Sequence, residues 1–123
     1  VTSASADERA RAGIGYIPWV KWRLDDIHME QGGDNPYLNR LPSDYMHDQF
    51  RFTTQPVGHT ADHPEHLAKL IDIAGTDLIM YSSDLPHPTF DPPEEFFDRI
   101  RNAFDADTVN RMMGGNAAEL FDL

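Results

Sequence analysis

A chain of 123 residues, with 40% hydrophobic and 11% aromatic residues, is long enough for one domain with a hydrophobic core. Ten Lys and Arg against 21 Asp and Glu give a net charge of −11, which repels nucleic acid and anionic membrane surfaces, so neither is an expected partner. The longest apolar run, Leu78 to Tyr81, is far shorter than the roughly 20 residues of a membrane-spanning helix, and the absence of cysteine excludes disulfides and thiolate metal sites. A soluble, cytoplasmic protein is therefore expected.

The first part of the chain predicts an arm followed by helices. Residues 1–12 are polar and small and predict an arm, while residues 13–123 predict the folded part. Apolar residues at helical intervals predict a helix from Tyr16 to Met29, ended by the glycines and proline of residues 31–36, with Tyr16, Trp19 and Trp22 in the core. A short helix follows Pro42, with the Ser43 hydroxyl capping its start.

Two segments have the composition of strands. Residues 50–55 alternate apolar and polar side chains until Pro56 and Gly58, which predicts a strand. The segment 77–84 begins as a continuous apolar run, which is typical of a strand buried on both faces of a parallel sheet.

Helices are predicted between and after these strands. Asp62 with Glu65, and Asp91 with Glu94, have the spacing of capping boxes. The first precedes an apolar stripe that Gly75 closes with a left-handed cap, and the second precedes a helix with an inner face of aromatic and aliphatic residues. These inner residues are Leu67, Leu70, Ile71 and Ala74 in the first helix, and Phe96, Phe97, Ile100 and Phe104 in the second. A last helix from about residue 105 is expected to break at Gly114 and Gly115.

The order strand, helix, strand, helix predicts an α/β fold with parallel strands and a right-handed crossover. Two parallel strands cannot form a stable sheet alone, because a parallel sheet needs several strands and cover on both faces. The chain therefore has the organisation of a slice of a larger α/β sheet or barrel.

The residues that follow the second strand offer the clearest chemistry. Asp84 and His87 come directly after its carboxyl end, the edge at which α/β folds collect active-site groups. A carboxylate at that place can bind a metal or act as a general base. The alternative is ordinary turn chemistry, in which Asp84 caps the turn before Pro86.

Three motifs in this order resemble the C-terminal part of the metal-dependent amidohydrolase-2 enzymes, barrel hydrolases and decarboxylases that include the aminocarboxymuconate-semialdehyde and resorcylate decarboxylases. The motifs are YSSDLPH at 81–87, LPSDY at 41–45 with FTTQP at 52–56, and GGNAAELF at 114–121. The resemblance runs from Gly13 to the end of the chain. It implies strands seven and eight, with their flanking helices, of a TIM-like (β/α)₈ barrel that another chain or segment completes.

The resemblance also implies roles for individual residues. Asp84 matches the strand-eight aspartate that ligates the metal or takes a proton from the attacking water, and His87 matches the histidine of the same motif. Gln55 and His59 fall where a substrate-binding wall would form. The family's other metal ligands belong to a region outside these 123 residues. The expectation is therefore a divalent metal ion, zinc or manganese, with most ligands supplied by a second polypeptide carrying the earlier strands, in a hetero- or homo-oligomer acting on a small molecule.

Two alternatives stay open. His59, His63 and His66 are close in sequence and could hold a metal of their own, although Pro64 lies among them and solvated or substrate-side histidines are the other interpretation. The chain could also be a non-catalytic, barrel-derived module for interaction or oligomerisation. The sequence does not separate hydrolysis from decarboxylation.

Overall fold

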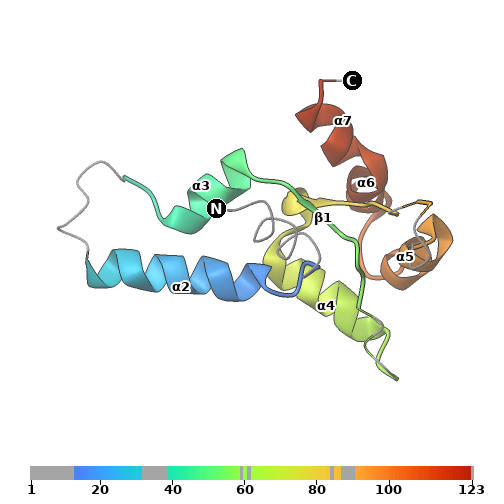
Figure 1. Ribbon diagram of the computed structural model, residues 1–123, viewed down its shortest axis with the longest axis horizontal. Coiled ribbons are helices and arrows are strands. Elements are labelled where there is room, and N and C mark those ends of the chain that lie inside the picture. The colour runs from blue at the N-terminus through green and yellow to red at the C-terminus, as the bar shows by residue number, and fades with distance from the viewer. Residues whose placement is uncertain are drawn as a thin grey trace.

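The computed structural model describes residues 13–31, 39–58, 60, 62–83, 85–86 and 91–122. The predicted arm at 1–12 lies outside this part of the chain. Within it the fold is α/β, with helices around a small parallel sheet (Figure 1). None of the described helices has both the length and the hydrophobicity needed to span a bilayer.

The sheet has two short strands in parallel. Strand β1 (Phe52–Thr53) pairs with β2 (Ile79–Met80), Phe52 opposite Ile79 and Thr53 opposite Met80. Between them the chain passes through α4 (Glu65–Ala74) and the 3₁₀ turn η1 (Thr76–Leu78). The predicted order of strand, helix and parallel strand is thereby confirmed.

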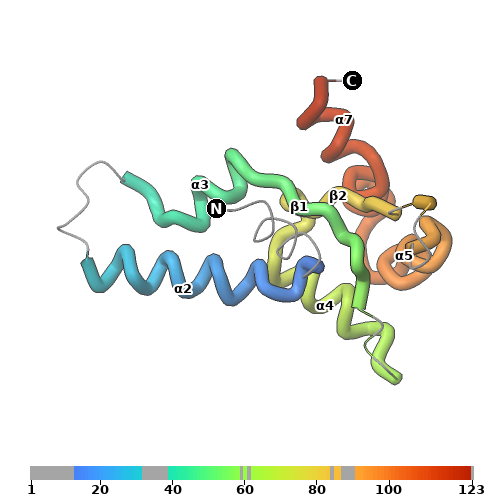
Figure 2. The backbone as a smooth tube through the Cα atoms, in the orientation of Figure 1, coloured from blue at the N-terminus to red at the C-terminus, as the bar shows by residue number. Residues whose placement is uncertain are grey.

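Two helices precede the sheet and a helical run follows it. Helices α2 (Ile17–Glu30) and α3 (Pro42–Gln49) lie alongside each other and extend away from the strands (Figure 2). After β2 come α5 (Pro93–Ile100), α6 (Ala106–Asn110), the π-helical segment η2 (Arg111–Gly115) and α7 (Asn116–Leu120).

The core lies where α4, α5 and η2 meet the sheet. Its inward side chains are almost fully buried and come from α2, α4, η1, β2, α5 and η2. They are Ile17, Ile71, Leu78, Ile79, Phe96, Ile100 and Met112. Phe96 also stacks on Tyr81, with ring centroids 5.7 Å apart. Burial of these apolar groups is the main stabilising contribution that the described residues make.

Both strands are shorter than the predicted segments 50–55 and 77–84. Phe50 ends α3, since its amide donates to the Met46 carbonyl, and Pro56 has no amide to donate. At the other strand, the 3₁₀ turn uses residues 76–78, and the Tyr81 amide donates to the Met112 carbonyl instead of to a strand. Each strand therefore keeps two residues in the ladder.

The predicted caps at Ser43, Asp62 and Asp91 are wrong. Helices α3, α4 and α5 begin after Leu41, Pro64 and Pro92, without a side-chain cap. The Ser43 hydroxyl donates to Asp25 at 2.7 Å instead, because α2 packs against α3. Gly75 also lacks the expected left-handed cap geometry, with φ 113° and ψ 117°.

Three predictions of packing also need correction. Gly114 and Gly115 do not break the last helix; they lie in the π-helical segment, whose Met112 carbonyl accepts from the strand-end amide of Tyr81. Phe97 is 38% exposed, because α5 turns only Phe96 and Ile100 fully inward. Trp19 and Trp22 are likewise outside the core, 64% and 56% exposed, on a face of α2 that no described residue covers.

Candidate functional site

The carboxyl ends of β1 and β2 meet at one edge of the sheet. The ladder continues one residue past the strands, because the Thr54 amide donates to the Met80 carbonyl at 3.0 Å. Thr54 and Gln55 therefore lie beside Tyr81 and Ser82. Parallel α/β folds collect functional groups at this edge.

Thr54 holds the two strand ends together. Its side chain is fully buried, and its hydroxyl oxygen accepts from the Ser82 amide at 3.1 Å and donates to the Ser82 carbonyl at 3.4 Å. The Gln55 amide in turn donates to the Ser82 hydroxyl at 3.4 Å. The backbone at residues 54–55 and 82 is thus fixed by hydrogen bonds across the sheet edge.

Asp91 closes the segment that follows β2. Its amide donates to the Ser83 carbonyl at 2.8 Å, its carboxylate accepts from the Val57 amide at 2.9 Å, and its carbonyl accepts from the Tyr81 hydroxyl. Burial raises the pKa of the Tyr81 phenol above its ordinary value, so this hydroxyl stays protonated and can donate. Asp91 thereby connects Val57, which follows β1, with Tyr81 and Ser83, which follow β2.

The structure locates the predicted site residues to different extents. Gln55 lies at the sheet edge and is partly buried. Asp84, His87 and His59 lie outside the described residues. The positions flanking Asp84 are anchored, since Ser83 accepts from Asp91 and the Leu85 amide donates to the Ser83 hydroxyl at 3.3 Å.

Asp91 is the residue whose role at this edge was missed by reasoning from the sequence. Its spacing to Glu94 was sufficient to interpret it as a helix cap. The two prolines that follow Asp91 were the available signal, because they remove two of the three amides at the start of the helix and leave only that of Glu94 for a cap. The carboxylate is consequently free to bind the Val57 amide, from a segment 34 residues earlier in the chain.

A cavity of about 290 Å³ opens beside the carboxyl end of β1. Its lining is mainly apolar and includes Gly13, Ile14, Pro56, Val57 and Leu70. A Cβ on Gly13 would lie 2.6 Å from the Pro56 carbonyl oxygen, so glycine lets the segment before α2 approach this wall closely. The cavity lies between α4 and the segment that follows Gln55, and it can take an apolar part of a small molecule.

A second cluster lies at the start of α4. Glu65 Oε1 is 3.3 Å from His63 Nδ1 and 3.9 Å from His66 Nε2. The third histidine considered for this cluster, His59, lies outside the described residues. Glu65 was assigned to a helix cap from its spacing, and the structure makes it the side chain that connects the two histidines.

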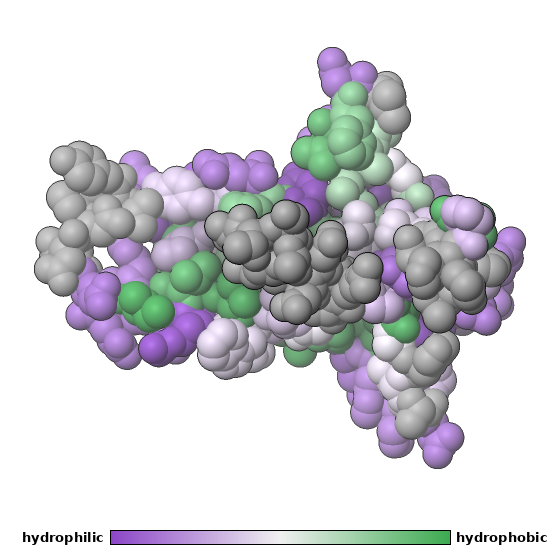
Figure 3. Space-filling view, in the orientation of Figure 1, coloured by the Kyte–Doolittle hydropathy of each residue, from purple (hydrophilic) through white to green (hydrophobic). Residues whose placement is uncertain are grey.

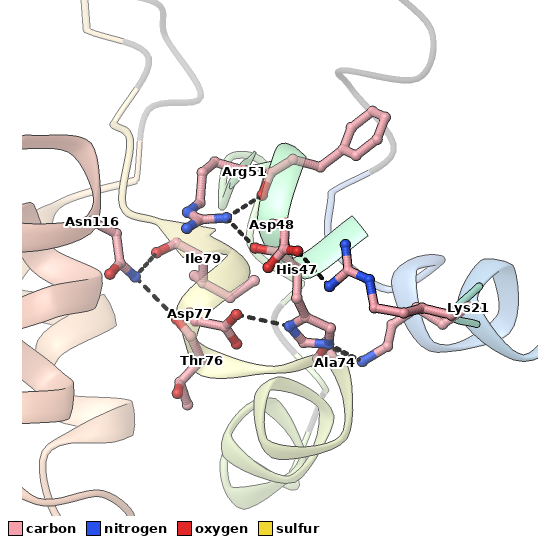
Figure 4. A network of polar contacts seen from close by, with 11 residues as sticks. Lys21, His47, Asp48, Arg51, Ala74, Thr76, Asp77, Ile79 and Asn116 are labelled. Carbon is pink, nitrogen blue, oxygen red and sulfur yellow. Dashed lines mark hydrogen bonds and ion pairs between the residues drawn. The ribbon is translucent and has the colours of Figure 1, made fainter. Parts of the chain in front are cut away.

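A third group of polar side chains lies at the amino end of β2. Figure 4 shows His47 between Lys21 and Asp77. The Lys21 ammonium donates to His47 Nε2 at 2.9 Å and to the Ala74 carbonyl at 2.8 Å, and His47 Nδ1 lies 2.7 Å from Asp77. An ammonium can only donate, so His47 accepts at Nε2 and donates to Asp77 from Nδ1. This network connects α2, α3 and η1 on the edge opposite the candidate site, so we assign it to stability.

The chain is similar to a known family and to solved structures. The family model described as Amidohydrolase matches residues 17–123. The chain is also similar to 5-carboxyvanillate decarboxylase LigW from Sphingomonas paucimobilis, with 28% sequence identity and a TM-score of 0.61 over 88% of this chain. The match covers 31% of the LigW chain, so these residues span about a third of that relative. No curated protein matches.

Proposed function

Because this chain belongs to the amidohydrolase family, we propose that it forms the strand-seven and strand-eight part of a metal-dependent TIM-like barrel enzyme. The enzyme would be a hydrolase or a non-oxidative decarboxylase of a small carboxylate or cyclic substrate. The observation that carries the proposal is the position of Asp84, one residue after the anchored Ser83 at the shared carboxyl end of two parallel strands.

Asp84 would act as a metal ligand or as the base of the reaction. Its carboxylate can take a proton from an attacking water or give one back to a product carbon, and the hydrogen bonds of the neighbouring Ser83 support this assignment. His87 would orient the substrate or Asp84, and Gln55 and His59 would contribute to the pocket wall. The apolar cavity beside Pro56 and Val57 suits the hydrocarbon part of a cyclic substrate.

The metal site needs ligands from outside these residues. At the described sheet edge the nearby groups are hydroxyls, amides, Gln55 and the Asp91 carboxylate, which accepts from the Val57 amide, and they do not by themselves form a zinc or manganese site. Asp84 is the ligand that this segment offers. When bound, a divalent ion would supply Lewis acidity and lower the pKa of a water molecule. This chain would therefore contribute one carboxylate to the metal site, and the earlier barrel strands would contribute the other ligands.

The remaining strands would come from polypeptide outside these 123 residues, either a second chain or a further segment. A complete barrel has about 250 residues, and the match covers 31% of the LigW chain. Both numbers support the proposal that these residues form one part of a barrel. The assembled enzyme would be an oligomer where the rest is a separate chain. We place it in the cytoplasm, because a chain without cysteine loses no disulfide in a reducing compartment.

The test is the Asp84→Asn variant of the assembled enzyme. The activity to measure is CO₂ release from a panel of aromatic and cyclic carboxylates that includes 5-carboxyvanillate, together with hydrolysis of esters, lactones and amides. Asparagine keeps the size of the side chain and removes its charge and basicity, so turnover is expected to fall by about 10²–10⁴-fold or more, with reduced metal content and an unchanged melting temperature.

The Asp98→Asn variant is the matched control, because Asp98 is exposed on α5, where it pairs only weakly with Arg101 at 3.7 Å. It should retain both turnover and metal. Near-normal turnover and full metal content in Asp84→Asn would remove Asp84 from the mechanism. They would favour the alternative, in which the chain is a non-catalytic interaction module and Asp84 a turn residue.

A further inference from the structure

Two histidines and a glutamate gather at the start of α4. The imidazole rings of His63 and His66 stack with centroids 4.6 Å apart and an angle of 12° between planes. Glu65 projects to the same side, and one ligand atom from each of the three side chains lies within 4.8 Å of the others. No other set of three potential ligands comes together this closely in the part of the chain that the structure describes.

The spacing of these atoms is that of ligands around one small cation. Nitrogen and oxygen ligands about 2.0–2.1 Å from a tetrahedral zinc ion lie roughly 3.3–3.4 Å from each other. Glu65 Oε1 is already 3.3 Å from His63 Nδ1 and 3.9 Å from His66 Nε2. All three side chains are more than half exposed. Small rotations can therefore bring them onto one ion, and water can complete its coordination.

The backbone that carries the histidines is fixed by hydrogen bonds. The His63 amide donates to the Thr60 carbonyl at 2.9 Å, and the Thr60 hydroxyl donates back to the His63 carbonyl at 2.7 Å. The same carbonyl accepts from the His66 amide at 3.0 Å, and Arg99 of α5 donates to the Thr60 hydroxyl at 3.1 Å. The two imidazoles are thus held near each other before any ion binds, which lowers the ordering cost of binding.

The charge around the cluster favours a cation. The chain carries a net charge of −11, and Asp62 lies next to His63 in the sequence. Glu65 adds a carboxylate in the first turn of α4. Two imidazoles with one carboxylate form a donor set suited to zinc and similar transition metals, whereas magnesium and calcium prefer oxygen ligands alone.

We propose that His63, Glu65 and His66 form a binding site for a divalent transition metal ion, with zinc as the reference ion and water completing its coordination. All three ligands come from four consecutive positions of this chain. The site does not depend on the proposed catalytic function of Asp84, so either proposal can fail without the other.

The experiment is a zinc titration of the assembled enzyme, purified with the earlier barrel strands, by isothermal calorimetry, and it is repeated with magnesium. Two variants each remove one ligand, His66→Gln and Glu65→Gln, and His28→Gln on α2 is the matched histidine control. Wild type and His28→Gln should bind one more zinc ion per chain than His66→Gln. The ligand variants should lose at least about 100-fold in affinity at this site, because changes to groups behind a metal ligand alone typically cost 10–100-fold. Magnesium should not occupy it.

X-ray absorption at the zinc edge identifies the ligands directly. The difference between the wild-type and His66→Gln spectra belongs to the zinc ion at this site. It should show scattering from two imidazole ligands. Repeating the titration in the Asp84→Asn background separates this ion from a catalytic one, since the His66-dependent zinc should remain. Equal zinc stoichiometry and affinity in wild type, His66→Gln and Glu65→Gln would overturn the proposal. Because the side chains of Glu65 and His66 are exposed, circular dichroism should show that these two variants fold.

Discussion

Gly75 determines the geometry of the polar network at the amino end of β2. Its φ of 113° is unfavourable for any residue with a side chain, and a Cβ would lie 2.6 Å from His47 Cε1 and 3.1 Å from Asp77 Oδ1. We predict that Gly75→Ala displaces the His47 ring, breaks its contacts with Lys21 and Asp77, and lowers the free energy of unfolding by about 1–3 kcal/mol. Urea denaturation of the assembled enzyme measures this change.

Gly58→Ala is the control for that prediction. A Cβ on Gly58 meets no atom within 4 Å, so this substitution should change the unfolding free energy by less than about 1 kcal/mol. Equal urea midpoints for Gly75→Ala and Gly58→Ala would contradict the prediction, because they would show that His47 makes room for the new methyl group without loss of stability.

Asp105 makes the stability of α6 depend on pH. Its carboxylate accepts from the Thr108 amide at 2.7 Å, and this hydrogen bond, with a smaller one from the Thr108 side chain, lowers the pKa of Asp105 below its ordinary value of 3.8. When the pKa of a carboxyl group is lower in the folded than in the unfolded state, its ionised form stabilises the fold. This stabilisation is fully present at pH values above the unfolded-state pKa, and it is lost as the pH falls through the folded-state pKa. Asp105→Ala should therefore melt below wild type at neutral pH, and the gap should close in acid below about pH 4.

Circular dichroism melts of the assembled enzyme across a pH series measure the gap. Asp105→Asn is the matched variant, because asparagine also caps helices and carries no titrating charge. Its melting temperature should stay near that of wild type at neutral pH. A gap between wild type and Asp105→Ala that persists unchanged at about pH 2 would contradict the assigned role of the ionised carboxylate.

Helix α5 is held to the fold by one aromatic side chain. Phe96 is 2% exposed and stacks on Tyr81, whereas the adjacent Phe97 is 38% exposed. Phe96→Ala should lower the unfolding free energy by about 3–5 kcal/mol, because it leaves a cavity in the core. Phe97→Ala should cost about 1 kcal/mol or less. Denaturant midpoints of the assembled enzyme measure both losses, and equal losses would mean that α5 buries a different face from the one described.

The elements that the sequence predicts well are those set by local periodicity. Helices α2, α3, α4 and α5 follow from apolar spacing and from Pro and Gly at their ends. The caps could not be predicted, because the partner of Ser43 is Asp25 on another helix and that of Asp91 is Val57 in a distant loop. The π-helical segment depends in the same way on the Tyr81 amide.

For the candidate site, one segment of sequence is enough to predict a carboxylate directly after a buried strand, and Asp84 stays such a prediction. Asp91 and Glu65 could not be assigned correctly, because each has the spacing of a helix cap and only tertiary packing shows what its carboxylate contacts.

At the scale of the whole molecule, apolar surface and strand edges are left uncovered by the described residues. Trp19 and Trp22 are more than half exposed, the sheet has two strands, and hydrophobic residues gather at the surface over α7 (Figure 3). Such surfaces drive association. We predict that the 123-residue chain expressed alone is aggregated, molten or tightly oligomeric, and that co-expression with the earlier barrel strands corrects this.

Sedimentation velocity and near-ultraviolet circular dichroism check the state of the chain. The co-expressed form should sediment as one defined species with ordered aromatic signals. A well-folded monomer of the isolated chain with a cooperative melt would contradict the proposed role as a part of a larger barrel.

The hydrogen bond from the Asp91 amide to the Ser83 carbonyl has a consequence for how this enzyme family can diversify. It brings the two ends of the segment 84–90 together, while β2 and α5 are each held by their own packing. Doubling the length of a flexible loop between fixed ends costs only about 0.6 kcal/mol. Longer segments between Ser83 and Asp91 in relatives are therefore expected to leave the sheet and α5 unaltered.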